Sequence, residues 1–175
     1  MGYDYSKKLS AVGQPDDMGC WYTSISWWTR AMALNCKRRA FDPLEIYAMF
    51  KDKVGDGWNA NQGSMPKSVL KDIGSSAVLR ITFEFIPANT FRDYEDIDSP
   101  LIIVFRYPAV KGGTHMNVLF NQQGNMVTAM EPYYPADAPD GTRTGNYIKR
   151  PMSFFTSSAE VGVGYASMAD SDMDQ

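Results

Sequence analysis

Thr114-His-Met-Asn-Val-Leu-Phe120 leads through Asn121-Gln-Gln-Gly-Asn125 into Met126-Val-Thr-Ala-Met130. Two apolar runs separated by a short polar turn that contains glycine predict a β-hairpin. Upstream, Val78 to Ile86 alternates as a strand does, and Leu101 to Phe105 is apolar enough to form a buried strand. The second half of the chain is therefore predicted to be a mostly antiparallel sheet.

The first half has the period of helices instead. Trp21, Ile25, Trp28 and Met32 are spaced by four, three and four residues. This spacing places them on one face of a helix, and we expect that helix to begin near Cys20. The aromatic cluster Trp21, Trp27 and Trp28 is expected to pack in the core, with Trp21 also bordering the Cys20 region.

A second helix has a clear start signal. Asp42 can serve as the N-cap, Pro43 suits the first helical position, and Glu45 completes a capping box. A further short helix is predicted over residues 64–73, with Gly74 ending it in the left-handed conformation.

Helices followed by antiparallel strands predict an α+β architecture, with a helical half packed against an antiparallel sheet. The 175 residues suit one core and contain no repeat or interior linker. We therefore expect a single domain over residues 1–168. The acidic residues 169–175 are predicted to be a frayed tail.

Composition excludes several classes of function. The formal charge is -3 and the basic residues are scattered, so a nucleic-acid partner is not expected. No apolar run approaches the roughly 18 residues of a membrane span, and the N-terminal residues lack the apolar core of a cleavable secretory signal. The predicted location is the cytoplasm, or outside the cell by a route that removes no signal.

The cysteine and histidine counts limit metal sites and disulfides. With two cysteines and one histidine, the chain offers no Cys/His cluster for a structural metal. Sixteen residues of helix between Cys20 and Cys36 would span roughly 24 Å, whereas a disulfide tolerates a Cα separation of roughly 6 Å. Both cysteines are therefore expected to be free.

Cys20 has the surroundings of a reactive thiol, although a lone cysteine is more often a small buried apolar residue. It falls in the first turn of the predicted helix, where free N–H groups and the helix dipole stabilise a thiolate. Gly19 permits close approach of a substrate backbone. Gln14, six residues upstream, can donate a hydrogen bond to a developing oxyanion.

His115 is the only histidine and thus the one side chain with an ordinary pKa near neutrality that could act as base for Cys20. Taken alone, it could simply cap a strand or face solvent. Glu131 lies sixteen residues later, at the far end of the hairpin, and can orient the imidazole if it is not merely solvated. Asn117 is less favoured because it lies about 7 Å along the strand from His115.

These segments resemble papain-like cysteine peptidases. Gln14-Pro-Asp-Asp-Met-Gly-Cys20-Trp21 is similar to their nucleophile segment, which has a Gln six residues before the Cys and a Trp after it. Gly113-Thr-His115 and the strand that ends in Glu131-Pro132 resemble the C39-like branch, which includes AvrRpt2-type bacterial effector proteases. Glu131 stands where that branch usually has Asp, and Tyr22 stands where Ser or Ala is common.

The resemblance implies a papain-like fold and a thiol protease that cleaves a protein substrate without cofactor or metal. Cys20 would be the nucleophile, His115 the base, Glu131 the orienting acid, and Gln14 an oxyanion-hole donor. It also implies cleavage after a Gly-Gly pair. The chain further resembles bacterial effector toxins, which implies delivery into a target cell by a specialised secretion system and an immunity protein in the producing cell.

Other functions stay open on the sequence alone. A peptidoglycan amidase or endopeptidase of the CHAP or NlpC/P60 type uses a related Cys-His pair. An acyltransferase or deamidase would run the same acyl-enzyme chemistry, and a binding module could keep the fold without the chemistry. The Pro- and Gly-rich stretch from Ala136 to Gly145 is predicted to be a surface loop that lines the substrate cleft.

Overall fold

The computed structural model describes residues 3–16, 19–54, 65–91, 99–106 and 113–167. Six antiparallel strands form one sheet in the order β1-β6-β2-β3-β4-β5. The strands are β1 (Ile81–Pro87), β2 (Leu101–Arg106), β3 (Thr114–Gln123), β4 (Met126–Glu131), β5 (Asn146–Pro151) and β6 (Glu160–Ala166). The helices are η1 (Tyr5–Lys7), α1 (Cys20–Ala33), α2 (Pro43–Val54), α3 (Lys67–Gly74), α4 (Ala88–Phe91) and η2 (Met152–Phe155).

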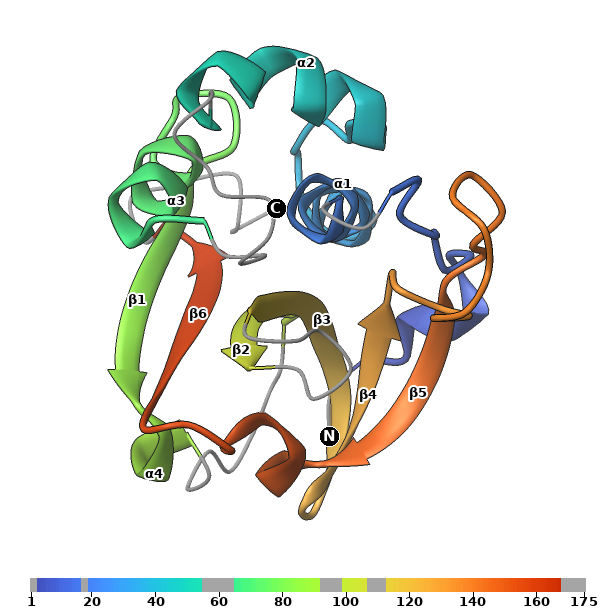
Figure 1. The fold of residues 1–175 in the computed structure, drawn as a ribbon, viewed down its shortest axis with the longest axis vertical. Coiled ribbons are helices and arrows are strands. Elements are labelled where there is room, and N and C mark those ends of the chain that lie inside the picture. Colours follow the sequence, from blue (N-terminus) through green and yellow to red (C-terminus); the bar gives the residue numbers. More distant parts are fainter. Residues whose placement is uncertain (1–2, 17–18, 55–64, 92–98, 107–112, 168–175) are drawn as a thin grey trace.

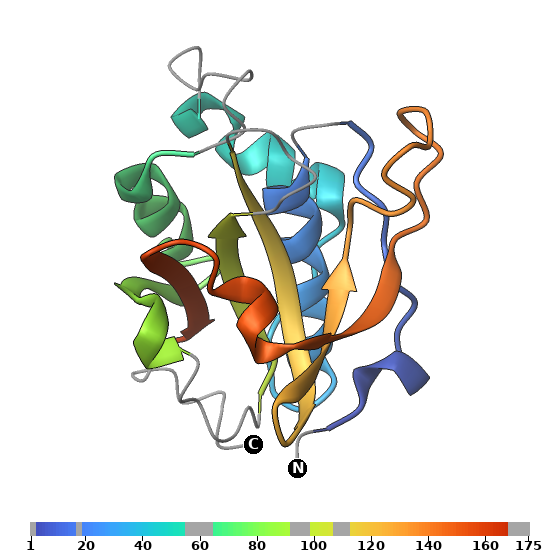
Figure 2. The same cartoon turned by 60° about the horizontal axis from the view of Figure 1, so that its bottom comes forward.

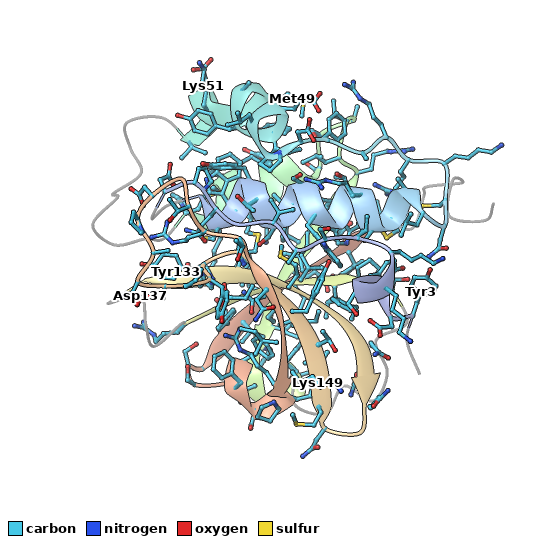
Figure 3. All side chains as sticks on the ribbon, turned by 90° about the vertical axis from the view of Figure 1, so that its right-hand side faces the viewer. Tyr3, Met49, Lys51, Tyr133, Asp137 and Lys149 are labelled. Atoms are coloured by element: carbon cyan, nitrogen blue, oxygen red, sulfur yellow. The ribbon has the colours of Figure 1, made fainter. Side chains whose placement is uncertain are left out.

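Helix α1 lies in the concave side of the curved sheet (Figure 1), with α2 over its other side. The layers are visible in Figure 3, where Met49 and Lys51 mark α2, α1 crosses the middle, and Lys149 lies on the sheet. The predicted apolar face of α1 is confirmed, since all four of its residues are buried. The helix is also buried on its polar side, at Ser26 and Thr29, because α2 covers what an exposed amphipathic helix would leave to water.

The predicted start of α2 is confirmed at Pro43, and the Glu45 carboxylate accepts the Asp42 backbone N–H at 2.9 Å. The role predicted for Gly74 is wrong. Gly74 is the last helical residue of α3, and the residue after it is still right-handed. A Cβ at Gly74 would lie 2.6 Å from the Phe83 ring, so the glycine serves close packing of α3 on β1 rather than left-handed termination.

The predicted hairpin is confirmed as β3 and β4, which pair with a register irregularity between Phe120 and Gln123. Strands β1 and β2 are also found where the sequence predicted them, within a few residues. Strands β5 and β6 were not predicted. Strand β5 is polar and carries little periodic signal. Strand β6 follows the other described strands in the sequence, yet it enters the sheet between β1 and β2 (Figure 1); it is the dark red arrow of Figure 2.

The sheet has a different core on each face. Met116 and Val118 of β3 belong to the larger core, which includes α1. Leu119 of the same strand belongs to a smaller core on the other face, with Phe105 and Phe155. Because side chains alternate along a strand, His115 and Asn117 point to the face with the smaller core.

Neither Cys20 nor Cys36 forms a disulfide, as predicted. Within the described part of the chain, no helix is long and apolar enough to cross a membrane. The predicted tail, residues 169–175, lies outside the described residues.

Candidate active site

Cys20 is the first residue of α1, and Gly19 is its N-cap. The first N–H of a helix has no partner within the helix, so the Cys20 backbone N–H makes no bond within α1. A Cβ at Gly19 would lie 2.7 Å from the Tyr22 hydroxyl. The glycine therefore lets the chain fold tightly over Tyr22, the bulky residue that departs from the family pattern.

His115 is the second residue of β3 and is buried, with 2% of its surface exposed. The imidazole is hydrogen-bonded to both the Cys20 and the Glu131 side chains. Its Nε2 atom contacts Glu131, which leaves Nδ1 for the thiol. One turn along α1 from Cys20, the Ser24 hydroxyl donates to the Met116 carbonyl at 3.1 Å and ties the helix to β3 beside His115.

Glu131 is the last residue of β4 and is 1% exposed. Val118 pairs with Met130, and one further step of this register places Glu131 opposite Asn117, with His115 diagonal to it. The carboxylate reaches along the strand to His115 through its Oε2 atom. The two groups predicted to meet across the hairpin do meet.

The Glu131 carboxylate has two further donors. The Tyr133 backbone N–H donates to Oε2 at 3.0 Å, and Arg150 Nη1 of β5 donates to Oε1 at 3.0 Å. The same Arg150 nitrogen donates to Asn117 Oδ1 at 2.7 Å. Asn117 thus belongs to the network through Arg150 and does not replace Glu131 as the partner of His115.

Electrostatics make the His115–Glu131 pair ionic. Burial by itself lowers the pKa of His115, but the Glu131 charge and the hydrogen bonds to Cys20 and Glu131 outweigh it and raise the pKa to about 9. Burial raises the pKa of Glu131, whereas His115, Arg150 and the Tyr133 N–H together hold that pKa well below its ordinary value. At neutral pH the arrangement favours an imidazolium beside a carboxylate.

Gln14 is 1% exposed and is tied to the acid end of the site, because its backbone N–H donates to the Pro132 carbonyl at 2.9 Å. Its side-chain Nε2 donates to the Asp16 carbonyl at 2.7 Å. With the Gln14 amide turned over, its Oε1 atom would face the Asp16 carbonyl oxygen, which cannot donate a hydrogen bond. This contact therefore identifies the amide atom that faces Asp16 as Nε2. Nε2 carries two hydrogens and keeps one for a further acceptor.

A cavity of about 290 Å³ adjoins the reactive pair. Cys20, Trp21 and His115 line one side of it, so Trp21 borders the site as predicted. The remaining walls come from the α3 region and from strands β1, β2, β3 and β6; these residues are Met65, Lys67, Leu70, Phe85, Val104, Phe105, Arg106, Thr114, Met116, Ser158, Glu160 and Gly162. The Lys67–Glu160 ion pair joins α3 to β6 at this cavity.

The loop from Ala136 to Gly145 does not line this cavity, contrary to the expectation from sequence. It instead holds the Gln14 segment, since the Gly141 N–H donates to the Pro15 carbonyl at 2.8 Å. Figure 3 labels Tyr133, which precedes the loop, and Asp137, which lies within it. This bond joins two segments that are far apart in the chain, which local sequence pattern does not reveal.

No group of three or more His, Cys, Asp or Glu side chains in the described residues could hold a metal ion. Among the residues that build the site, sequence reasoning missed Arg150. Its strand was not predicted, and nothing in the local sequence Asn146-Tyr-Ile-Lys-Arg-Pro151 singles out one basic residue.

No protein-family model matches the chain, and no curated protein matches it in sequence. Among solved structures, the peptidase domain of Streptococcus ComA, a bifunctional ABC transporter of a quorum-sensing pathway, aligns with a TM-score of 0.59. The alignment covers 91% of this chain and 98% of that domain at 16% identity. The chain has the fold of a C39 peptidase domain.

A double-glycine motif protease of an AMS/PCAT transporter, solved with a leader peptide, aligns with a TM-score of 0.48 at 15% identity over 89% of each chain. The fold-level match confirms the predicted papain-like α+β architecture, with helices packed on an antiparallel sheet.

Proposed function

We propose that this protein is a cysteine peptidase that cleaves a protein or peptide through Cys20, His115 and Glu131. One observation carries the proposal: a thiol at a helix start is hydrogen-bonded to a buried imidazole, which is bonded in turn to a buried carboxylate. Thiol and imidazole also border a cavity. The fold shared with the ComA peptidase domain supports the same conclusion.

In the proposed mechanism, a single proton moves between the Cys20 thiol and the His115 imidazole before it reaches the leaving amine. The Cys20 thiol gives its proton to His115 Nδ1, and the thiolate attacks the substrate carbonyl carbon. The Cys20 backbone N–H and the second Nε2 hydrogen of Gln14 stabilise the oxyanion. The C–N bond then breaks as His115 protonates the leaving amine, and water, deprotonated by His115, hydrolyses the thioester. Glu131 stays ionised and holds the imidazole in position.

The first test needs no substrate. Iodoacetamide labelling followed by peptide mass spectrometry should show Cys20 reacting faster than Cys36, which lies beyond the end of α1 and donates to the Met32 carbonyl at 3.0 Å. A C36A variant is the matched control and should keep the fast reaction, whereas C20A should lose it. Equal labelling of the two cysteines would sink the mechanism.

Cleavage after a Gly-Gly pair is a narrower proposal that rests on the C39-like resemblance. Three peptides that differ only in containing Gly-Gly, Gly-Ala or Ala-Gly should be cut by wild type, fastest for Gly-Gly and slowest for Ala-Gly. The C20A variant should cut none of them. The mass of the products separates hydrolysis from acyl transfer or deamidation. Equal rates on the three peptides would remove the Gly-Gly preference but leave the peptidase.

The effector setting is also a proposal, and it would place an immunity protein in the producing cell, as for toxins delivered by a secretion system. The AvrRpt2-type relationship stays a prediction. Expression in bacterial cytoplasm and in periplasm tests the setting. Harm that appears only in the periplasm, and that C20A abolishes, would favour a peptidoglycan substrate over a protein one.

A further inference from the structure

The Glu131 carboxylate divides its two oxygens between two cations. Oε2 faces His115, and Oε1 accepts from Arg150 Nη1 at 3.0 Å. A glutamate has one more rotatable bond than the aspartate usual at this place in the resembling family. A side chain with that extra freedom needs a second point of attachment to keep one oxygen on the imidazole.

We propose that Arg150 is a positioning residue of the catalytic site, which holds Glu131 so that a glutamate can do the work of the shorter acid. The inference rests on the function proposed above and assigns a role to a residue that does not touch the reacting atoms. Arg150 acts on His115 only through Glu131.

The guanidinium is itself fixed on several sides. Arg150 is 8% exposed, its Nη1 donates to Asn117 Oδ1 at 2.7 Å, and its Cζ lies 4.2 Å from the centre of the Phe154 ring. Asn117 lies opposite Glu131 in the hairpin register. A buried cation held by an amide, a carboxylate and an aromatic face has a defined position, and it transmits that position to the carboxylate.

The charges alternate along the network. The charged and titratable groups that face Glu131 are His115 from β3 and Arg150 from β5, and the group that faces His115 from α1 is Cys20. With Cys20 as thiolate and His115 protonated, each anion lies beside a cation and the four charges sum to zero. Arg150 thus keeps the buried cluster neutral while Glu131 remains an anion.

The test compares R150M with R150K and with R38M. R150M keeps an apolar stem and removes the charge and the donors, whereas R150K restores a cation with several donors. Arg38 is the matched control: it is half-buried, donates to the Leu79 carbonyl at 2.6 Å and lies 5.1 Å from the centre of the Trp28 ring, away from the Cys20 cavity. R38M therefore reports the loss of a packed arginine without a change at Glu131.

Two readouts need no substrate. The first is the rate of Cys20 alkylation against pH, whose acid limb reports loss of the thiolate–imidazolium pair. The second is NMR titration of the imidazole, which is unambiguous because His115 is the only histidine. In R150M, Glu131 protonates more readily, so the anion that holds His115 protonated is lost at higher pH. The acid limb of the Cys20 alkylation profile should therefore move up by about one pH unit. On acidification, the NMR signals of His115 should likewise begin to change at a higher pH than in wild type.

R150K should recover most of the shift, and R38M should match wild type in both readouts. If R150M does not fold, the comparison of E131Q with E131Q/R150M decides, because the double variant leaves no unpaired buried charge. The two should have the same alkylation profile if Arg150 acts through Glu131.

Three results would overturn the proposal: an unchanged acid limb in folded R150M, no recovery in R150K, or different profiles for E131Q and E131Q/R150M. Failure of the proposed function itself looks different. In that case wild-type Cys20 would show no preferential alkylation at any pH, before any substitution at Arg150 is considered.

Discussion

The helix side and the sheet side of the site present their groups in different ways. Cys20 lies at a helix start, half-buried, with its backbone N–H free for a ligand. His115, Glu131 and Arg150 lie on three adjacent strands, and each is at least nine-tenths buried. The helix side thus offers a thiol and a backbone N–H at the cavity, and the charged sheet side is shielded from water, where ionic contacts are stronger.

The largest effect is expected from breaking the contact between the two sides. H115Q removes the base and the cation that stabilise the Cys20 thiolate, so alkylation at neutral pH and any peptidase activity should fall by about 10² to 10⁴-fold. The measurement is the second-order alkylation rate at pH 7, with circular dichroism as the check on folding. A rate within twofold of wild type would show that Cys20 is reactive without His115.

A somewhat smaller effect is expected from E131Q, which keeps the shape of the sheet side but removes its anion. Without the carboxylate, the pKa of His115 falls from about 9, because the opposing effect of burial remains. The NMR titration of the His115 imidazole should therefore move to lower pH, and the Cys20 alkylation rate at pH 7 should drop by about tenfold or more. An imidazole titration that stays in place would show that Glu131 does not set the pKa of His115.

The same ion pair predicts how stability depends on pH. The pKa of His115 is raised in the folded state, so its contribution is fully present below the ordinary value near 6.5 and is lost as pH rises through about 9. Glu131 has a lowered pKa, so its contribution is present above its ordinary value near 4.5 and is lost as the solution is acidified below that. Urea unfolding measured from pH 5 to pH 10 should show that the free energy of unfolding of wild type falls above pH 6.5. The fall should be smaller in E131Q.

The smallest effect is expected at the seam between the sides. S24A removes the hydrogen bond to the Met116 carbonyl and should cost about 1 kcal/mol of unfolding free energy. It should also lower the Cys20 alkylation rate a few-fold, since the helix start is less firmly held against β3. S26A is the matched control: it breaks a buried bond from α1 to the Phe41 carbonyl, 2.5 Å long, on the side away from the sheet. If S24A and S26A lose similar stability but only S24A alkylates more slowly, the bond between Ser24 and β3 helps to position Cys20.

The sequence predicted those parts of the molecule that local pattern determines. The apolar face of α1, Pro43 at the start of α2, and the hairpin of His115 and Glu131 each follow from spacing or from turn and cap chemistry. These features give the fold class and bring the acid to the base.

The remainder depends on contacts between distant segments. Strand β5 pairs with β4 although its own residues are largely polar, and Arg150 reaches Glu131 across that pairing. The misplaced roles have the same origin: Gly74 is set by the Phe83 ring packed on it, and the loop 136–145 by the Gln14 segment it holds. No local rule of helix or turn formation contains these partners.

The order of strands also governs when the site is completed during synthesis. Strand β6, which follows the other described strands in the sequence, lies between β1 and β2 and supplies Glu160 and Gly162 to the cavity wall. A nascent chain emerges N-terminus first, so the thiol, the imidazole and the acid are all translated before that wall exists. The cavity therefore cannot be completed until β6 has left the ribosome and inserted between β1 and β2, after the residues of the site are already in place.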